Sequence, residues 1–249
     1  MHRKKRSLSD GRVLDVVPWK EEPMHHCLHK ADWCVVYEAR LPPGTTTMWH
    51  VHDKNTVYVC IEDGSKKGKP VISTAVNDTE DVLHDPVEFE VGCGDTFCMW
   101  HAEKTFTHQV SAHESNVGET RFLGIEILGT PAISGRNDEL ENFQYTLVED
   151  RGVVKVWRLH LHPNSTTGMH SITSPSVFVA LSEGNLESNG RVKNEGLNRS
   201  DAAFPFQALY YPGQFHVLED PMELCFVNRG SEHFEAMLVQ WSSPGGLPD

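Results

Sequence analysis

Residues 41–64, LPPGTTTMWHVHDKNTVYVCIEDG, decide the fold, because the same pattern returns later in the chain. Residues 161–184, LHPNSTTGMHSITSPSVFVALSEG, align with them without a gap, 120 positions further on. Each stretch has a turn, a histidine and a β-branched run that closes at a glycine. Such a repeat of strand and turn signals indicates a duplicated domain. The identical pairs are Leu41/Leu161, Pro43/Pro163, Thr46/Thr166, Thr47/Thr167, His50/His170, Val57/Val177, Val59/Val179 and Gly64/Gly184.

Short apolar runs separated by turns extend through the rest of the chain. CVVYEARL, TRFLGIEIL and VVKVWRLHL are examples of the runs, and EDGSKKGKP and SEGNLESNG are examples of the turns. This spacing, without a long amphipathic helix, predicts an all-β sandwich or barrel. A chain of 249 residues suits two such domains. We expect an N-terminal arm at residues 1–24, a barrel at 25–128, a linker at 129–143 and a second barrel at 144–249.

Composition and charge restrict the partners of this protein. No apolar run approaches the roughly 20 residues of a membrane helix, and a formal net charge of −13 would repel nucleic acid. We therefore expect a small-molecule substrate, no nucleic acid and no membrane, and we leave a homodimer open. Six cysteines without a signal peptide indicate reduced thiols in a cytoplasmic protein. The basic run HRKKR, residues 2–6, is expected to lie in a disordered, solvated tail.

His50 and His52 are the first candidate metal ligands. Residues spaced i, i+2 on a strand point to the same face, so both imidazoles can line one barrel wall while Val51 faces away. A third imidazole from a facing strand would close a three-nitrogen site with open positions for water or substrate. Histidines that are hydrogen-bonded in an ordinary core are the alternative.

The sequence around these histidines resembles the cupin superfamily. Its first motif has a Gly, five residues, His-x-His and a strand that closes at a Gly, matched here from Gly44 to Gly64. Its second motif opens with Gly-Asp, matched by Gly94-Asp95, and ends in a third His. The resemblance implies a double-stranded β-helix, the jelly-roll cupin barrel, duplicated as a bicupin.

Within this resemblance the third ligand is expected to be His108. The segment HQV that begins at His108 is β-branched and strand-like, whereas the competitor His101 lies in the polar loop WHAEKTF. That loop, with Trp100 and Glu103, is a candidate for the pocket mouth. The resemblance thus implies a metal held by His50, His52 and His108.

Thr56 departs from the family pattern, which usually has a Glu at this position. An all-histidine site resembles those of the cupin thiol dioxygenases and β-diketone dioxygenases. Without a protein carboxylate the metal keeps its full positive charge, which favours an anionic, chelating substrate. The resemblance implies a divalent metal with Fe(II) favoured and Zn, Mn or Ni as alternatives, and it weakens the analogy to oxalate-degrading and seed cupins.

The second barrel keeps only His170 of the metal motif. Ile172 occupies the place of the second His, and the region around Leu224 lacks the third, so we expect this barrel to hold no metal. In the first barrel Tyr58 and Cys60 share the strand face that follows Thr56. They are our candidate catalytic residues, with ordinary core packing as the alternative.

Three functions are compatible with these residues. The first is an Fe(II) oxygenase acting on a small anionic or enolisable substrate, in which the protein supplies positioning and a dry cavity. The second is a non-redox lyase or isomerase in which the metal acts as a Lewis acid. The third is a binding or storage protein without enzymatic activity. We favour the first.

Overall fold

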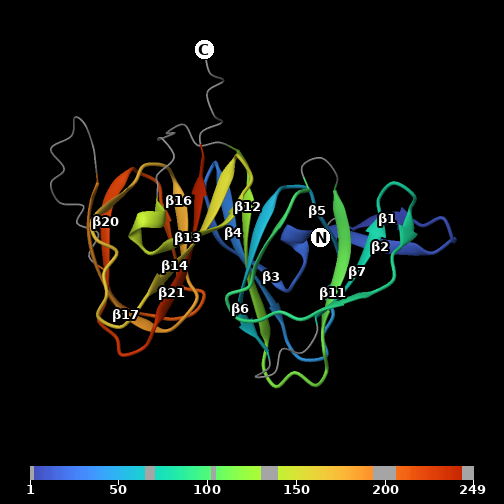
Figure 1. Ribbon diagram of the computed structural model, residues 1–249. Helices are drawn as coiled ribbons and strands as arrows, with labels where there is room; N and C mark the ends of the chain where they lie inside the picture. Colours follow the sequence, from blue (N-terminus) through green and yellow to red (C-terminus); the bar gives the residue numbers. More distant parts are fainter. Residues whose placement is uncertain (1–2, 65–70, 102–104, 130–139, 193–205, 243–249) are drawn as a thin grey trace, which may run out of the picture. The chain divides into compact units, whose positions relative to one another are not determined.

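The computed structural model describes residues 3–64, 71–101, 105–129, 140–192 and 206–242, and β-strands make up nearly all of their regular secondary structure (Figure 1). The only helices among them are two short 3₁₀ segments, η1 (Trp19–Glu21) and η2 (Leu140–Phe143). The all-β prediction is therefore confirmed. No helix in the described part of the chain has the length and apolar character to cross a membrane. The chain divides into two compact units, Met1–Gly129 and Thr130–Asp249.

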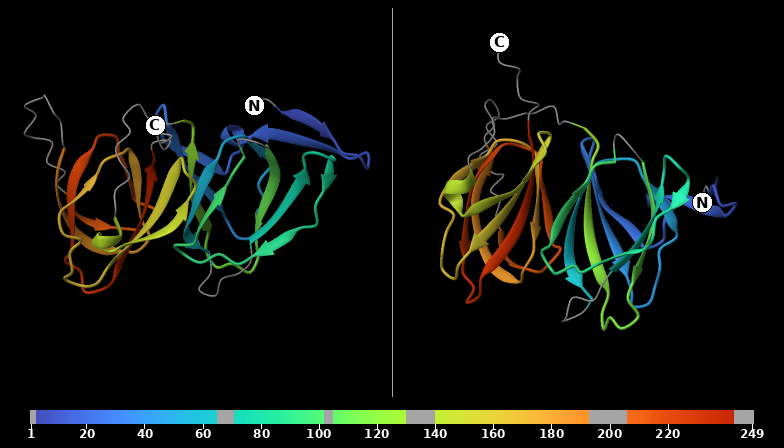
Figure 2. Two further views of the ribbon diagram at one scale, coloured as in Figure 1. Left: turned by 45° about the horizontal axis from the view of Figure 1, so that its top comes forward. Right: turned by 45° about the vertical axis from the view of Figure 1, so that its right-hand side comes forward.

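Unit 1 consists of two sheets that curl toward each other (Figure 2). One sheet has the strand order β1-β2-β5-β11-β7-β8 with β9 also on β7, and the other has the order β10-β6-β12-β4-β3. Pairing is antiparallel except for β2 and β5, which run parallel. The strands are β1 (Lys4–Ser7), β2 (Val13–Pro18), β3 (His25–Lys30), β4 (Cys34–Leu41), β5 (Trp49–His52), β6 (Thr56–Asp63), β7 (Val71–Asn77), β8 (Val82–Leu83), β9 (Val87–Phe89), β10 (Thr96–Met99), β11 (Phe106–Ala112) and β12 (Thr120–Ile127).

Unit 2 repeats this arrangement in sheets ordered β13-β14-β21-β16-β19 and β15-β20-β17-β18. The offset of 120 positions extends back to the first strand of each barrel, because His25 pairs with Ala39 and Tyr145 pairs with Leu159. Its strands are β13 (Tyr145–Asp150), β14 (Val154–Leu161), β15 (His170–Ile172), β16 (Ser176–Ala180), β17 (Gly184–Val192), β18 (Phe206–Tyr210), β19 (Phe215–Leu218), β20 (Met222–Asn228) and β21 (Phe234–Trp241).

The first glycine of the motif closes the turn before β5. Gly44 has a φ of +69°, and its equivalent Asn164 has a φ of +58°. Glycine and, next to it, asparagine adopt this left-handed conformation most readily. The turn thus keeps its backbone geometry in both units although the residue differs.

The interiors of the two barrels differ. A continuous cluster of buried side chains packs the inside of unit 2, including Trp157, Ile172, Phe178 and Phe226. Unit 1 instead encloses a cavity of about 520 Å³. Side chains thus pack the interior of unit 2, as in an ordinary protein core. The interior of unit 1 has space of the size found in ligand pockets.

The expectation of a disordered, solvated N-terminal tail is wrong for the described residues. Strand β1 pairs with β2 over Lys4–Ser7, and β2 runs beside the histidine strand β5. The Arg6 guanidinium forms ion pairs with Asp78 and Asp81 and donates to Thr107 Oγ1 at 2.9 Å. Backbone pairing with β2 and the ion pairs of Arg6 with the turn after β7 hold the described part of the basic run.

The linker expected at residues 129–143 is described only at its two ends. Residues 130–139 lie outside the described part of the chain. Residues 140–143 form η2, and the side chain of Leu140 is only 1% exposed within the core of unit 2. Leu140 therefore packs in the core of unit 2, although its neighbours in the sequence are polar.

Candidate metal centre

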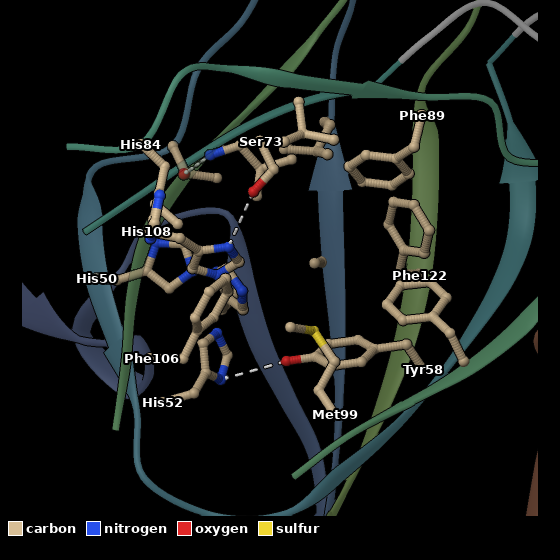
Figure 3. Close-up of a pocket in the computed structure, with 18 of the residues that line it drawn as sticks. His50, His52, Tyr58, Ser73, His84, Phe89, Met99, Phe106, His108 and Phe122 are labelled. Atoms are coloured by element: carbon tan, nitrogen blue, oxygen red, sulfur yellow. Dashed lines mark hydrogen bonds between the residues drawn. The ribbon is translucent and has the colours of Figure 1, made fainter. Parts of the chain in front are cut away.

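Strands β5 and β11 place three histidines at one end of the unit 1 cavity (Figure 3). Along β5 the side chains of His50 and His52 are 0% and 1% exposed, and they alternate with the half-buried Trp49 and Val51. His108 pairs with His50 across the two strands. The centroid of the His50 ring lies 4.4 Å from that of His108 and 5.0 Å from that of His52. The structure thus brings together the three residues expected to be ligands.

The hydrogen bonds of these histidines leave one ring nitrogen of each available. The Nδ1 of His50 donates to the Met48 carbonyl at 2.8 Å, which places its hydrogen on Nδ1. The Nδ1 of His52 lies 3.4 Å from the Tyr58 hydroxyl, and that of His108 lies 3.5 Å from Ser73 Oγ. Every Nε2 of the three is buried and has no hydrogen-bond partner among the described residues. Buried polar atoms without a partner are costly, so a ligand for them is expected. A divalent metal fits this set of donors.

His25, on strand β3, is a fourth histidine of this centre that the sequence analysis missed. Possible ligand atoms of His25, His50 and His52 all lie within 4.8 Å of one another. The His25 and His50 ring centroids are 4.7 Å apart. His108 is outside that tightest group, with its ring centroid 5.2 Å from that of His52. A metal near His50 can therefore draw ligands from His25, His52 and His108.

Glu22 holds His25 from behind. Its Oε2 accepts from His25 Nδ1 at 2.7 Å and from the Met24 amide at 2.8 Å, and its Oε1 accepts from the Met48 amide at 3.1 Å. Burial opposes ionisation of Glu22, but the hydrogen bonds from His25 and the two amides outweigh it and lower its pKa. An ionised carboxylate on Nδ1 orients the ring and leaves Nε2 for a metal.

The repeat places His25 at the position that Tyr145 occupies in unit 2. At an offset of 120, His25 corresponds to Tyr145, and His50 corresponds to His170. In unit 2 the Tyr145 hydroxyl lies 3.3 Å from His170 Nε2, so this histidine has a partner. Its Nδ1 also bonds the Gly168 carbonyl at 3.1 Å, and the Phe143 ring stacks on it. Ile172 is the equivalent of His52 at the same offset. His108 is the strand partner of His50, and the strand partner of His170 is Leu224. His170, the one motif histidine that unit 2 keeps, is thus a core residue with hydrogen-bond partners for both ring nitrogens.

Burial keeps the imidazoles of His50, His52 and His108 neutral. Removal from water, followed by the influence of His25, lowers the pKa of His50 to about 3. Burial and then neighbouring imidazoles hold the pKa values of His52 and His108 well below their usual range. Neutral imidazole is the form that binds a metal.

These lowered pKa values predict a pH-dependent stability of the metal-free protein. Between pH 6.5 and 5 the unfolded chain takes up protons on His50, His52 and His108 that the folded chain excludes. Stability therefore falls as the pH falls, by up to about 1.4 kcal/mol per pH unit for each histidine. Integrated over this range for the three histidines, the free energy of unfolding in urea should drop by about 5 kcal/mol.

His108→Gln should reduce that slope, because it removes one of the three histidines whose protonation the folded chain excludes. A free energy of unfolding that is level from pH 6.5 to 5 in metal-free protein would contradict the prediction.

His101, the competing third ligand, occupies a different position. It is 4% exposed, and its ring stacks on Phe106, which in turn lies 4.5 Å from the His108 ring. Its own ring centroid is 5.9 Å from that of His52. It lines a second, smaller cavity of about 370 Å³ rather than the large one. Glu103 lies outside the described residues.

The two candidate catalytic residues of β6 are placed differently. Tyr58 lines the large cavity, accepts a hydrogen bond from the Tyr37 hydroxyl at 3.1 Å, and has its pKa raised by burial. Cys60 lies in a core cluster with Leu41 and Phe122 and is not part of the cavity wall. Burial, with nearby Cys93, raises the pKa of its thiol to about 12. Thr56 is 1% exposed and donates to the Lys54 carbonyl at 3.1 Å.

Solved structures that include a cupin barrel protein have a fold similar to that of this chain. No protein-family model and no curated protein matches the sequence. The solved structure of AerE from Microcystis aeruginosa is similar with a TM-score of 0.57 at 10% identity, over 97% of each chain. A cupin 2 conserved barrel domain protein from Leptotrichia buccalis has a TM-score of 0.50 at 10% identity, over 88% of each chain.

A variant of Bacillus subtilis oxalate decarboxylase has a TM-score of 0.54 at 13% identity, over 97% of this chain and 75% of its own. Another structure of that enzyme was used to study its Mn(II) centres. Identities this low show the fold alone. The duplicated jelly-roll barrel predicted from the sequence is confirmed.

Proposed function

We propose that unit 1 is the active site of a metal-dependent cupin enzyme, an Fe(II) oxygenase that acts on a small enolisable substrate bound as its anion. The proposal rests on the convergence of buried, neutral imidazoles whose Nε2 atoms have no hydrogen-bond partner among the described residues. The group of possible metal ligands found among those residues consists of histidines and contains no carboxylate. A divalent metal in such a site keeps its charge, which favours an enolate over a neutral ligand.

The residues that would hold the metal are His50, His52 and His108, with His25 beside them. Fe(II) bound here would supply both positive charge for an enolate and redox activity toward dioxygen. Mn, Zn and Ni also suit imidazole ligands. Glu22 and the Met48 carbonyl fix the orientation of His25 and His50 through their Nδ1 atoms.

Tyr58 would position the substrate. When His52 presents Nε2 to a metal, its Nδ1 carries the hydrogen and can donate to the Tyr58 oxygen, 3.4 Å away. The Tyr37 hydroxyl donates to the same oxygen. Both acceptor positions of the Tyr58 hydroxyl are then filled, and its own hydrogen is left for the cavity. Since burial raises the pKa of Tyr58, it stays protonated and can donate to a substrate oxygen.

The test is an oxygen-consumption assay on anaerobically purified, Fe(II)-loaded protein with β-diketones as substrates. We expect oxygen uptake in proportion to substrate, and a loss of about 10- to 100-fold in kcat for Tyr58→Phe, as expected for the removal of one preorganised donor. Tyr145→Phe, which removes a buried hydroxyl from unit 2, serves as the matched control and should keep full activity.

Turnover that proceeds equally without dioxygen would replace the oxygenase by a non-redox lyase or isomerase. Failure of the folded protein to retain metal would contradict enzymatic metal chemistry altogether.

A further inference from the structure

The wall of the unit 1 cavity opposite the histidines is apolar and aromatic. In Figure 3 the labelled histidines lie on one side, and Phe89 and Phe122 lie across the cavity from them. Side chains of β4, β9, β10, β11 and β12 form this wall. They include Leu41, Phe89, Phe97, Met99, Val110 and Phe122. A molecule that reaches the histidines with one end must therefore bury its other end against hydrocarbon.

The described residues that line the cavity carry little charge. No Lys or Arg is among the described residues that line it, and the one acidic side chain is Asp85, in the exposed segment at its rim. A dianion would find one positive centre and would leave its second charge against Phe and Met side chains. Burial of an unpaired charge is strongly unfavourable.

The volume and the rim agree with an apolar ligand. About 520 Å³ is within the range of pockets for drug-sized molecules and far exceeds the space that a two-carbon diacid needs. Val87, which lines the cavity, is 60% exposed at its rim. An apolar side chain in that position lies where a hydrophobic ligand would enter.

We propose that the substrate consists of a ring-sized apolar body and a single polar, metal-chelating end of at most one negative charge. The polar end lies at the histidines beside Tyr58, and the body packs against Phe89 and Phe122. The chelating end of the substrate rests on the proposed function, whereas its apolar body is inferred from the cavity alone.

Two hydroxamates measure the preference in Zn-loaded protein, which holds no redox-active metal. Isothermal titration should show benzohydroxamate binding about 30-fold tighter than acetohydroxamate, the ratio expected from burying a phenyl group in place of a methyl. Oxalate should bind no tighter than acetohydroxamate. Phe89→Ala should reduce the preference several-fold, whereas Phe215→Ala, a partly buried phenylalanine of unit 2, should leave it unchanged.

A second probe is independent of metal. Toluene has no chelating group, and ligand-observed NMR should detect its binding to the metal-free protein. Val110→Phe, which adds a ring inside the cavity, should abolish toluene binding and retain acetohydroxamate binding to the Zn-loaded form. Equal affinity for the two hydroxamates, tighter binding of oxalate, or absence of toluene binding would overturn the inference. Loss of metal binding with toluene binding intact would overturn the proposed function and leave the apolar cavity standing.

Discussion

His50→Ala is expected to remove bound metal from the protein, from about one ion per chain to less than a tenth of that after dialysis. His50 is the central histidine, since its ring lies 4.4 Å from that of His108, 4.7 Å from that of His25 and 5.0 Å from that of His52. Loss of groups that merely orient a ligand costs 10–100-fold in metal affinity, so loss of a ligand should cost more than about 100-fold. Elemental analysis and titration with a competing chelator measure the effect.

His170→Ala is the matched control, because this histidine is the equivalent of His50 and has its Nε2 bonded to Tyr145. It should keep the full metal content. If His170→Ala alone stripped the metal, the site would have been placed in the wrong unit.

Single substitutions of His25 and His108 then define the ligand set. Metal loss in both variants indicates four ligands, and loss in one alone identifies the third. Loss in His101→Ala with none in His108→Ala would move the third ligand to the smaller cavity.

Gly124→Ala is expected to destabilise unit 1 by about 3 kcal/mol, at the upper end of what overpacking a core costs. The backbone of β12 passes directly beneath the Tyr37 ring, and a Cβ on Gly124 would lie less than 3.0 Å from three of its carbon atoms. Tyr37 has no room to retreat, because it is 0% exposed and stacks on Trp19 with ring centroids 4.1 Å apart. For a chain of this size the melting temperature should fall by about 6–12 °C.

Gly129→Ala is the control for this prediction, since a Cβ there meets nothing within 4 Å. Its melting temperature should stay within about 1–2 °C of the wild type. If the clash with the ring is the cause, Tyr37→Leu should recover part of the loss in the Gly124→Ala background, a non-additive coupling. Equal melting temperatures for Gly124→Ala and wild type would show that Tyr37 can move aside.

Part of the candidate site could be predicted from the sequence, because the relevant geometry is local. The i, i+2 spacing puts His50 and His52 on one face of β5 whatever the rest of the chain does. The duplication at an offset of 120 identified the barrel in which the motif is complete. The fold itself followed from strand and turn signals, which repeat in both halves.

The alternation of side chains along a strand predicts which face a residue lies on, but not which residues of that face reach the cavity. Tyr58 and Cys60 share one face of β6, yet only Tyr58 reaches the cavity wall. Cys60 lies further along the strand, where Leu41 and Phe122 cover it. Similarly, the charged run that includes Arg6 forms a strand that pairs with β2, and Arg6 meets Asp78 and Asp81, which are distant in the sequence.

Sequence patterns were therefore enough to predict the duplicated all-β fold, the first barrel as the one with the complete histidine motif, and the direction in which His50 and His52 point. The three-dimensional arrangement was needed to show that His25 and Glu22 belong to the centre, and that the cavity opposite it is apolar and without Lys or Arg among its described lining residues. The two kinds of feature differ in range. Side-chain direction depends on the backbone of a few residues, whereas the approach of β3 to β5, and the space left between facing sheets, depends on how the whole barrel closes.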